Sequence, residues 1–456
     1  MASVSKKASD DIKKKYKKMT QLEHIRELPD TYIGSVEEAP FDMWVFTEGE
    51  MTKKTINIVP GFYKIFDEIL VNAIDQYIRL QQEGKKTGVT DIRVEINEED
   101  NSISVYNNGD GIDVAIHPEH KIYVPEMIFG QLLTSANYKK EKKITGGKNG
   151  YGAKLTNIFS KEFHIETLDA RRGLKFKQRF YDNMGGKDKA KVTKNKGKPY
   201  TKITFKPDLE FFGMERFNED ILSLLRKRVY DICANTDKKV SVSLNGKKLG
   251  INNFEKYIEL FNVENIVYER INDRWEIGVG LASDDKLEQV SFVNGIYTHK
   301  GGKHVDYITG QIGRKLLKWI KDKKKNKTVK QQHIKDNLWV FVKCSIENPS
   351  FDSQTKDFLT TPTTKFGSTC DLKSKFIDKI AKKCGIVERA IALSAYKEAT
   401  QISKKEGKKK SNLHGIPKLD DANFAGTAKS NMCTLILTEG ESAKAFAIAG
   451  ISALKN

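Results

Sequence analysis

Three short segments rich in polar residues or glycine constrain the fold of this chain more than any other feature. The first runs from Glu68 to Asp75, the second from Asn107 to Gly111, and the third from Gly146 to Lys154. Each lies within or beside a run with helical or strand periodicity, so each is expected on the face or at the end of a regular element. A fold that brings them together places a carboxylate, amides and glycine backbone at one site.

The first segment has the pattern of an amphipathic helix. Glu68, Asn72 and Asp75 are spaced i, i+4 and i+7 and therefore share one helix face. A carboxylate and an amide one turn apart suit phosphoanhydride hydrolysis, with Glu68 as general base and Asn72 as a Mg²⁺ ligand. A merely solvated polar face explains the octapeptide alone equally well. The opposite face carries the expected core residues Ile65, Phe66, Ile69, Leu70, Ala73 and Ile74.

The second segment follows a predicted hairpin. Apolar residues alternate over 92–96 and 103–105, and the polar run 97–101 separates the two stretches. Gly109 and Gly111 permit close backbone approach to a flat ligand, and the Asn107 amide is suited to pair with an adenine edge. An ordinary Asn-Gly turn is the alternative interpretation.

The third segment is the strongest single signal. Gly147, Gly150 and Gly152 lead into residues 153–159, a plausible helix start whose free N–H groups would bind phosphate. The segment follows a lysine-rich stretch and not a buried strand, which argues against a dinucleotide-binding βαβ unit. A G-x-x-x-x-G-K-[ST] loop occurs nowhere in the chain. The remaining interpretation is a lid over a triphosphate.

In this order and at these separations, the three segments resemble the nucleotide-binding boxes of the GHKL ATPases. Within that superfamily the chain resembles eukaryotic-type DNA topoisomerase II, from about Gln21 to its last residue. The resemblance implies an α+β fold in which a GHKL (Bergerat) ATPase α/β sandwich is followed by a ribosomal-S5-like transducer domain. The segments that carry it are 29–34 (PDTYIG), 65–73 (IFDEILVNA), 132–138 (LLTSANY), 150–155 (GYGAKL), 353–356 (SQTK), 416–422 (IPKLDDA) and 434–443 (TLILTEGESA).

The resemblance also assigns roles to single residues. Glu68 is expected to act as general base, Asn72 as Mg²⁺ ligand and Asn107 as nucleoside contact. Lys356 is expected to touch the γ-phosphate and to report its loss; without the resemblance it fits an exposed loop lysine. Tyr16 is expected to reach the partner subunit's ATP site. The other expected ATP contacts are Ser135, Ala136, Asn137, Gly147, Lys148, Asn149, Gly150, Tyr151, Gly152, Ala153, Lys154, Thr201, Gln354 and Thr355.

The expected domain order follows from the same comparison of segments. Glu439 would ligate Mg²⁺ in a last domain of the TOPRIM type, at an incomplete site, because the chain stops at Asn456 before the family's Asp-x-Asp pair and DNA-cleaving tyrosine. The expected limits are an arm at 1–28, the ATPase domain at 29–254, the transducer at 255–406, a connector at 407–431 and the start of the TOPRIM domain at 432–456.

Periodicity predicts further elements. The ATPase part is expected to have helices on one face of a mostly antiparallel sheet. Strands are predicted at 163–168, 174–181, 201–206, 275–281, 290–294, 338–346 and 433–437, and helices at 304–321 and 373–383.

Charge indicates a polyanionic partner. The formal net charge is +19, and between Gly313 and Lys330 nine Lys or Arg residues face one acid. A solvated helix face is the alternative for this run. The five cysteines lack metal or disulfide spacing, and no apolar stretch approaches the ~20 residues of a membrane span, so no membrane partner is expected. The expected duplex DNA contacts are Lys321, Lys323, Lys324, Lys325 and Lys327.

ATP and Mg²⁺ are therefore the expected cofactors, duplex DNA and a second copy of the chain the expected partners, and the nucleus the expected location. The expected function is the ATPase region of a type IIA DNA topoisomerase, in which Mg-ATP closes a dimer gate and hydrolysis reopens it. The main alternative is a GHKL clamp that grips protein, as chaperones do. A histidine kinase fits less well, because no His lies in a dimerisation hairpin ahead of the boxes. An ATP-binding DNA tether without turnover is the third possibility.

Overall fold

The computed structural model describes residues 15–16, 18–84, 88–134, 143–147, 150–325, 328–405, 419–422 and 424–453. The chain forms two compact units that alternate along the sequence. The first comprises Met1–Asn262, Phe292–Lys303 and Lys343–Ser368, and the second Val263–Ser291, His304–Val342 and Thr369–Asn456. The segment that carries Lys356 is thus part of the first unit, although the sequence places it in the predicted transducer.

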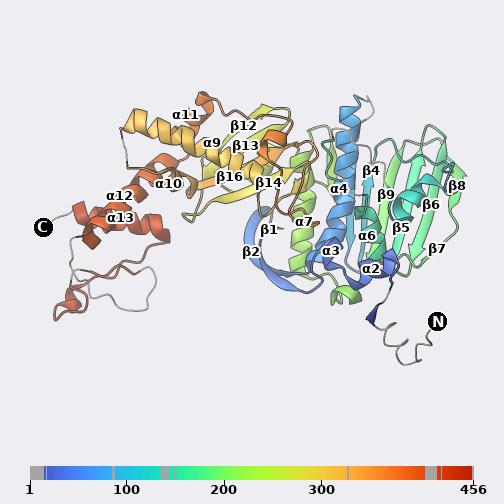
Figure 1. Cartoon of the computed structure of the whole chain (residues 1–456), viewed down its shortest axis with the longest axis horizontal. Helices are drawn as coiled ribbons and strands as arrows, with labels where there is room; N and C mark the ends of the chain where they lie inside the picture. The colour runs from blue at the N-terminus through green and yellow to red at the C-terminus, as the bar shows by residue number, and fades with distance from the viewer. Residues whose placement is uncertain are drawn as a thin grey trace, which may run out of the picture. The chain divides into compact units, whose positions relative to one another are not determined.

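A nine-stranded sheet forms one layer of the first unit (Figure 1). Its strand order is β11-β10-β3-β4-β9-β5-β6-β7, with β8 paired to β6. Strands β10 and β3 are parallel, and the other pairs are antiparallel, as predicted. The strands are β3 (Asp91–Asn97), β4 (Ser102–Asn107), β5 (Ser160–Asp169), β6 (Leu174–Tyr181), β7 (Gly186–Lys187), β8 (Lys191–Lys194), β9 (Tyr200–Pro207), β10 (Ser241–Leu244) and β11 (Lys247–Lys248).

The predicted hairpin is confirmed by β3 and β4, in which Ile96 pairs with Ile103. On its other side β4 pairs with β9, and Asn107 lies opposite Thr201. Because successive side chains point to opposite faces of a strand, Asn107 lies on the same face as the buried Val105, and Tyr106 lies on the other. The sheet thus has one face in the core and one face toward solvent.

Helices cover the core face of the sheet (Figure 1). The 23-residue helix α4 (Pro60–Gln82) has Pro60 in its first turn, where the missing N–H costs nothing, and buries the whole predicted core stripe. Beside it lies α7 (Glu219–Asn235), whose N-cap Asn218 accepts a hydrogen bond from the Ile221 N–H. The shorter helices of this layer are α5 (Val124–Gly130) and α6 (Gly152–Ile158).

A buried ionic cluster joins α7 to α4. Arg228 Nε lies 2.6 Å from Asp67 Oδ1, and its Nη2 donates to the Gly295 carbonyl at 2.9 Å. Lys227 Nζ lies 2.9 Å from Asp231 Oδ2. Arg228, Lys227 and Asp231 are completely buried, and Asp67 nearly so. Each charge therefore has a partner of opposite sign, as burial of a charge requires.

The remaining elements of the first unit lie at the start of the chain and beyond α7. The capping box of Thr20 and Glu23 begins α2 (Gln21–Glu27), and α3 (Asp30–Ile33) follows. The hairpin of β1 (Ala39–Thr47) and β2 (Glu50–Ile58) packs on α7, where the rings of Phe46 and Tyr230 stack at 3.8 Å. Helix α8 (Phe254–Glu259) also packs on α7.

A second sheet has the order β12-β13-β16-β14-β15, and most of its residues lie in the second unit. Its strands are β12 (Val267–Asn272), β13 (Trp275–Leu281), β14 (Glu288–Val293), β15 (Ile296–Tyr297) and β16 (Leu338–Cys344). The helices that follow these strands in sequence or lie between them are α9 (Lys303–Trp319), with a π-helical turn at Ile320–Lys324, α10 (Gln331–Lys335), α11 (Ser374–Lys383) and α12 (Ile386–Lys405). The strands and helices predicted here are confirmed, apart from their exact ends.

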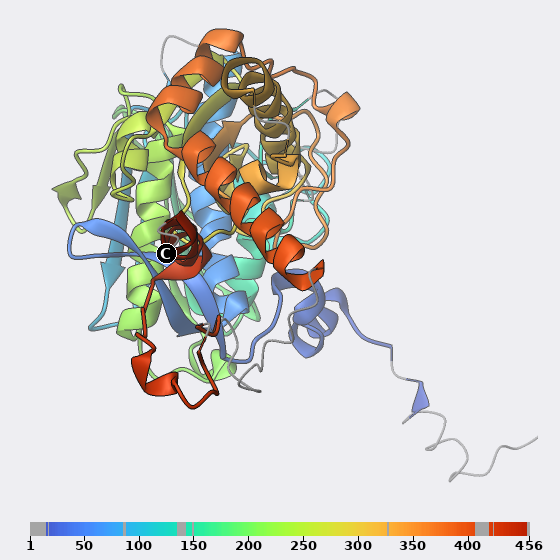
Figure 2. The same ribbon diagram turned by 90° about the vertical axis from the view of Figure 1, so that its left-hand side faces the viewer.

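Helix α12 is the long orange-red helix of Figure 2, and α13 (Gly440–Ala453) packs on it. The strand predicted at 433–437 is wrong. Leu435 and Leu437 are 71% and 86% exposed, and none of the strands in the described ranges pairs with this segment. An extended segment without a neighbouring strand lacks the hydrogen bonds that define a sheet. Within the part of the chain that the structure describes, no helix is long and apolar enough to cross a membrane.

Candidate functional site

The three sequence segments meet in the first unit along helix α4. Gly152, the first residue of α6, lies so close to Glu68 that a Cβ atom added there would overlap Oε2. Two turns further along α4, Asp75 contacts the backbone of the third segment, and Gln76 contacts Asp110 of the second. The predicted convergence of the three segments is therefore confirmed.

Two lysines share one oxygen of Glu68. Lys64 Nζ lies 2.6 Å from Oε1, and Lys356 Nζ lies 3.2 Å from the same atom. All three side chains are buried, with relative exposures of 3%, 3% and 7% for Lys64, Glu68 and Lys356. The other oxygen, Oε2, faces Gly152. The carboxylate thus has one oxygen held by two ammonium groups and one directed toward the start of α6.

These charges control the protonation of Glu68. Burial alone raises the pKa of its carboxyl, but the positive charges and hydrogen bonds of Lys356 and Lys64 lower that pKa to about 2. Burial lowers the pKa of Lys64, but the negative charges of Glu68 and Asp67 outweigh this effect and raise it overall. The group is therefore an ionised carboxylate at neutral pH despite its burial.

The loop that carries Lys356 has a strained backbone. Lys356 has φ of +63°, a left-handed conformation that is costly for a residue with a Cβ atom. The loop is held by the Thr355 hydroxyl, which donates to Asp357 Oδ2 at 2.8 Å, and by Lys300, 3.3 Å from the same carboxylate. Thr355 also lies against Gly34, where a Cβ atom would come within 2.9 Å of its methyl group.

Asp75 holds the start of the third segment. Its carboxylate oxygens accept the N–H groups of Gly146 and Gly147 at 2.6 and 2.7 Å. Burial raises the pKa of Asp75 to about 6, against the lowering effect of these two hydrogen bonds. The first described glycines of the predicted phosphate loop therefore already bind an anionic group of the protein itself.

Lys154 links the third segment to Thr134. The lysine is 2% exposed, and its Nζ donates to the carbonyls of Thr134 and Gly150 at 2.8 and 2.6 Å. Burial lowers its pKa to about 8. Lys154 thus joins Gly150 of the third segment to Thr134, and Gly150 itself has a left-handed backbone (φ +68°).

Polar side chains gather where β4, β9 and β5 lie side by side. Asn107 is buried and lies opposite Thr201 in the register of β4 and β9. The Thr201 hydroxyl is 3.2 Å from that of Thr167, which accepts the Ile112 N–H at 3.0 Å. An amide with hydroxyl groups beside it offers both donors and acceptors to a planar heterocycle.

Asn72 has the geometry of an available metal ligand. It lies one turn after Glu68 on α4, its side chain is exposed, and it makes no hydrogen bond to another residue of the described ranges. In those ranges no group of three or more His, Cys, Asp or Glu residues could hold a metal by itself. A metal held at Asn72 would therefore share its ligands with a bound anion and water.

The structure leaves several of the predicted assignments untested. Ser135, Ala136, Asn137, Lys148, Asn149 and Lys327 lie outside the described residues. Tyr16 is 70% exposed and its ring contacts the Lys15 ammonium. Glu439 is exposed and precedes α13 in the second unit. These assignments stay predictions.

The basic run of the second unit has two parts. Lys315 and Trp319 bind within the unit, to Asp371 at 2.7 Å and to Asp378 at 2.8 Å. The four lysines that follow are exposed and have no ion-pair partner among the residues the structure describes; they are Lys321, Lys323, Lys324 and Lys325. They form a cationic turn available to an anionic partner.

The sequence did not reveal the roles of Lys64 and Thr167. Lys64 lies i−4 from Glu68, and this spacing is the signal that could have found it. Thr167 has no such signal, because it is one threonine among several in a strand. Asp75 was placed on the correct helix face, but its bonds to Gly146 and Gly147 were not foreseen.

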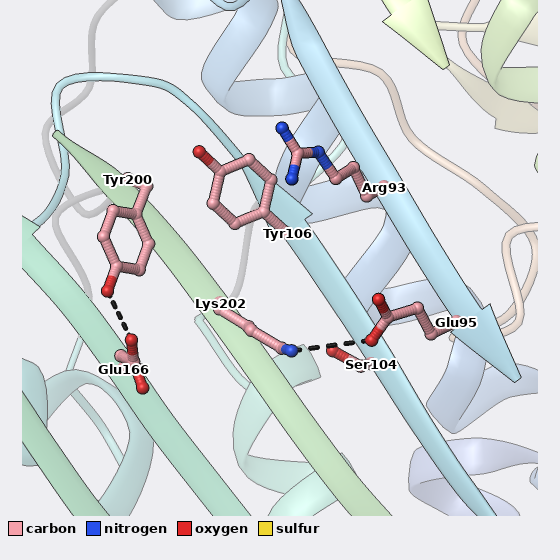
Figure 3. A pocket seen from close by; sticks show the side chains of 7 residues that line it. All are labelled: Arg93, Glu95, Ser104, Tyr106, Glu166, Tyr200 and Lys202. Carbon is pink, nitrogen blue, oxygen red and sulfur yellow. Dashed lines mark hydrogen bonds and ion pairs between the residues drawn. The ribbon is translucent and has the colours of Figure 1, made fainter. Parts of the chain in front are cut away.

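A shallow hollow of about 240 Å³ lies on the solvent face of the nine-stranded sheet and is separate from the Glu68 site. Figure 3 shows its lining: Arg93, Glu95, Ser104, Tyr106, Glu166, Tyr200 and Lys202. Lys202 lies 3.5 Å from Glu95, and Tyr200 donates to Glu166 (Figure 3). Its charged groups thus largely satisfy one another.

Two family models match the chain. Residues 58–210 match the histidine kinase-, DNA gyrase B- and HSP90-like ATPases, and residues 240–410 match DNA gyrase B. The chain is 49% identical over 97% of its length to DNA topoisomerase 2 of Pisum sativum, and 48% identical over 97% to that of Drosophila melanogaster. It spans only 30% and 31% of the length of these curated relatives.

Solved structures agree with these matches. The ATPase region of Saccharomyces cerevisiae topoisomerase II is 47% identical to this chain, with a TM-score of 0.77. The superposition covers 84% of this chain and 99% of the yeast chain. The ATPase and transducer domains of DNA topoisomerase II from Balamuthia mandrillaris are 42% identical, with a TM-score of 0.80 and coverages of 85% and 99%. The 43K ATPase domain of Thermus thermophilus gyrase B, at 23% identity and TM-score 0.54, shares the fold.

The buried Glu68 carboxylate should make the free energy of unfolding of this unit depend on pH in the acid range. Because the pKa of Glu68 is lower in the folded than in the unfolded chain, its contribution is complete above pH 4.5 and is lost as the pH falls toward 2. In urea unfolding at a series of pH values, Glu68→Gln should therefore lose less stability on acidification than the wild type.

The control for this titration is Glu219→Gln on α7. Glu219 pairs with Arg226 at 2.6 Å, but its side chain is 70% exposed, so solvent screens the pair. This variant should keep the wild-type dependence on pH. An unchanged dependence in Glu68→Gln would contradict the ionised, buried carboxylate.

Proposed function

Because the chain belongs to the type II DNA topoisomerases, as an N-terminal ATPase and transducer region, we propose that its first unit hydrolyses ATP at Glu68. The buried carboxylate with its free oxygen toward Gly152 is the observation that carries the proposal. A water placed beside Oε2 would attack the γ-phosphorus and transfer a proton to Glu68. The bond from phosphorus to the bridging oxygen then breaks, and ADP leaves with its electron pair.

The residues present fit a Mg²⁺ ion bound with the nucleotide. The exposed Asn72 amide would hold it, with phosphate oxygens and water completing the shell, as Mg²⁺ prefers. When bound, the ion neutralises phosphate charge during transfer. Asn72 lies one turn after Glu68 on α4, so the residue that would hold the metal is separate from the residue that would accept the water's proton.

The other contacts follow the polarity of the site. Asn107, Thr201 and Thr167 suit the base and sugar of the nucleotide, and the backbone of Gly150 and Gly152, at the start of α6, suits the phosphates. Lys356 lies within 3.2 Å of Glu68, so its ammonium is already beside the point where a γ-phosphate would be cleaved. Gln354 and Thr355 belong to the same loop. The phosphate would replace Glu68 as the partner of Lys356.

We extend the proposal to the whole cycle of the relatives. ATP binding would bring two copies together, with Tyr16 of each arm reaching the partner's site, and close a gate around duplex DNA. Loss of the γ-phosphate would release Lys356 and open the gate. The cationic turn of Lys321, Lys323, Lys324 and Lys325 supports a DNA contact, and a chromosomal DNA substrate would accord with the nucleus as the proposed location.

A second candidate function is an ATP-driven clamp for protein, since the fold is shared with HSP90-like ATPases. The unpaired lysines of the cationic turn favour DNA over protein as the second ligand, because a chaperone has no need for them. Glu439, as a Mg²⁺ ligand of a TOPRIM domain, would also have no role in a chaperone.

Replacement of the base tests the chemistry. Glu68→Ala should bind ATP and dimerise but lose turnover by about 100-fold or more, since proton transfer by a positioned base contributes 10²–10⁴-fold. Steady-state phosphate release and equilibrium nucleotide binding measure the two properties. Glu83→Ala, at the exposed end of α4, is the control and should turn over normally. Retained turnover in Glu68→Ala would remove Glu68 as the base.

The mass of the chain in solution tests the gate. With Mg²⁺ and a non-hydrolysable ATP analogue, the wild type should shift from monomer toward dimer, and Lys356→Ala should weaken this shift. Lys365→Ala, an exposed lysine of the same segment, should not. If nucleotide is bound and the mass stays that of a monomer, the gate mechanism fails and an ATP-binding domain remains.

Duplex DNA separates the two candidate functions. Turnover should rise with added duplex for a topoisomerase region and stay constant for a protein clamp. Alanine at all four positions of the cationic turn should reduce the slope of log affinity against log salt concentration by about 3 to 4. The reason is that each lost phosphate contact removes roughly 0.9 from this slope. Lys247→Ala with Lys248→Ala, on the exposed strand β11, should leave it unchanged.

A further inference from the structure

Lys64 and Lys356 bind the same oxygen of Glu68 but are attached differently. Lys64 lies on α4 itself, one turn before Glu68, and is 3% exposed. Of its other acidic neighbours, Asp67 is 3.8 Å away and is bound by Arg228 at 2.6 Å, and Asp357 is bound by Lys300 and Thr355. Lys64 is therefore a fixed partner of Glu68, and Glu68 is the carboxylate that lies within hydrogen-bonding distance of it.

Lys356 is by contrast a removable partner. It comes from the loop 353–357, its backbone is left-handed, and its Nζ is 0.6 Å farther from Oε1 than Lys64 Nζ, at 3.2 against 2.6 Å. Under the proposed function, on which this inference rests, the γ-phosphate attracts Lys356. Glu68 then loses one of its two cations while it stays buried.

A buried carboxylate that loses its positive partners becomes protonated and cannot accept a proton from water. The groups that face Glu68 decide whether this happens. They are Lys64 on α4, Lys356 on the loop and, more distant on α4, Asp75. Asp67 and Asp357 face Lys64, and Lys154 of α6 directs its Nζ to two carbonyls instead. Once Lys356 has moved, Lys64 is the cation left in contact with the carboxylate among the residues described.

We propose that Lys64 is the positioning residue of the general base: it keeps Glu68 ionised and Oε1 fixed after Lys356 has left, so that Oε2 remains directed at the water beside Gly152. Lys356 has the complementary effect before nucleotide binds, because it stabilises the ionised Glu68 and so makes it a weaker base. Arrival of the γ-phosphate removes this restraint. The two lysines thus divide the tasks of holding the base and restraining it.

The test compares Lys64→Met with the wild type. Methionine keeps the length and apolar stem of the side chain but removes the charge. Turnover at pH 7 should fall by between about 10- and 100-fold, as expected for a mispositioned base, while KM for ATP stays within about twofold. The acid limb of the kcat profile should move up by about one pH unit or more, since a lost cation raises the pKa of a carboxyl.

Lys227→Met is the matched control. Lys227 is also a completely buried helix lysine in an i,i+4 ion pair, with Asp231 at 2.9 Å, and it does not touch Glu68. If Lys64 only contributes to stability, both variants should lower the unfolding midpoint and leave the acid limb in place. A shift of the acid limb in Lys64→Met alone supports the positioning role.

Lys64→Arg keeps the experiment decisive if the methionine variant does not fold. Arginine retains the charge, so the acid limb should stay near its wild-type position while kcat falls through altered geometry. If the acid limb in Lys64→Arg moves up by about one pH unit, the inference is overturned, because arginine keeps the charge. It is also overturned if the pH profile of Lys64→Met equals that of Lys227→Met.

Failure of the inference is distinguishable from failure of the proposed function. If Glu68→Ala abolishes turnover but Lys64→Met leaves kcat and its pH profile unchanged, the base is correct and the role of Lys64 is wrong. If Glu68→Ala turns over normally, the proposed function fails first, and Lys64 has no base to position.

Discussion

Burial of the Glu68 carboxylate is the constraint on which the site depends. A charge at 3% exposure is unstable without partners, and a single helix offers Glu68 only Lys64 at the required distance. The second partner, Lys356, lies 288 residues along the chain. This contact joins the segment Lys343–Ser368 to α4 within the first unit, although the second sheet separates the two in sequence.

The cluster around Arg228 extends the same principle away from the site. Asp67 is the neighbour of Glu68 in the chain, and its partner Arg228 also holds the Gly295 carbonyl at the turn between β14 and β15. The turn packs on α4, since a Cβ atom at Gly295 would come within 2.6 Å of Ile74. The helix that carries Glu68 is thus fixed by paired charges at Asp67 and by hydrophobic packing at Ile74, two turns further along the same face.

Periodic patterns predicted the parts of the fold that periodicity governs. The core stripe of α4, the β3–β4 hairpin and strands β5, β6 and β9 follow from alternating or helical spacing of apolar residues. Lys64 and Arg228 could not be predicted as buried, because a charged residue on a helix is normally solvated and only its tertiary partners show otherwise. The incorrect strand at 433–437 has the same cause: apolar composition favours a strand, but pairing decides it. Resemblance, not pattern, indicated Lys356.

The left-handed backbone of Lys356 has a consequence for nucleotide affinity. A residue with a Cβ atom loses about 1–2 kcal/mol in this conformation relative to negative φ. If the loop relaxes when its ammonium transfers to phosphate, this energy is returned to the bound state and can strengthen binding by about 5- to 30-fold. Glycine at this position would remove both the charge and the stored energy. In the proposed cycle, the side chain and the torsion angle of this one residue would therefore both favour the nucleotide-bound state.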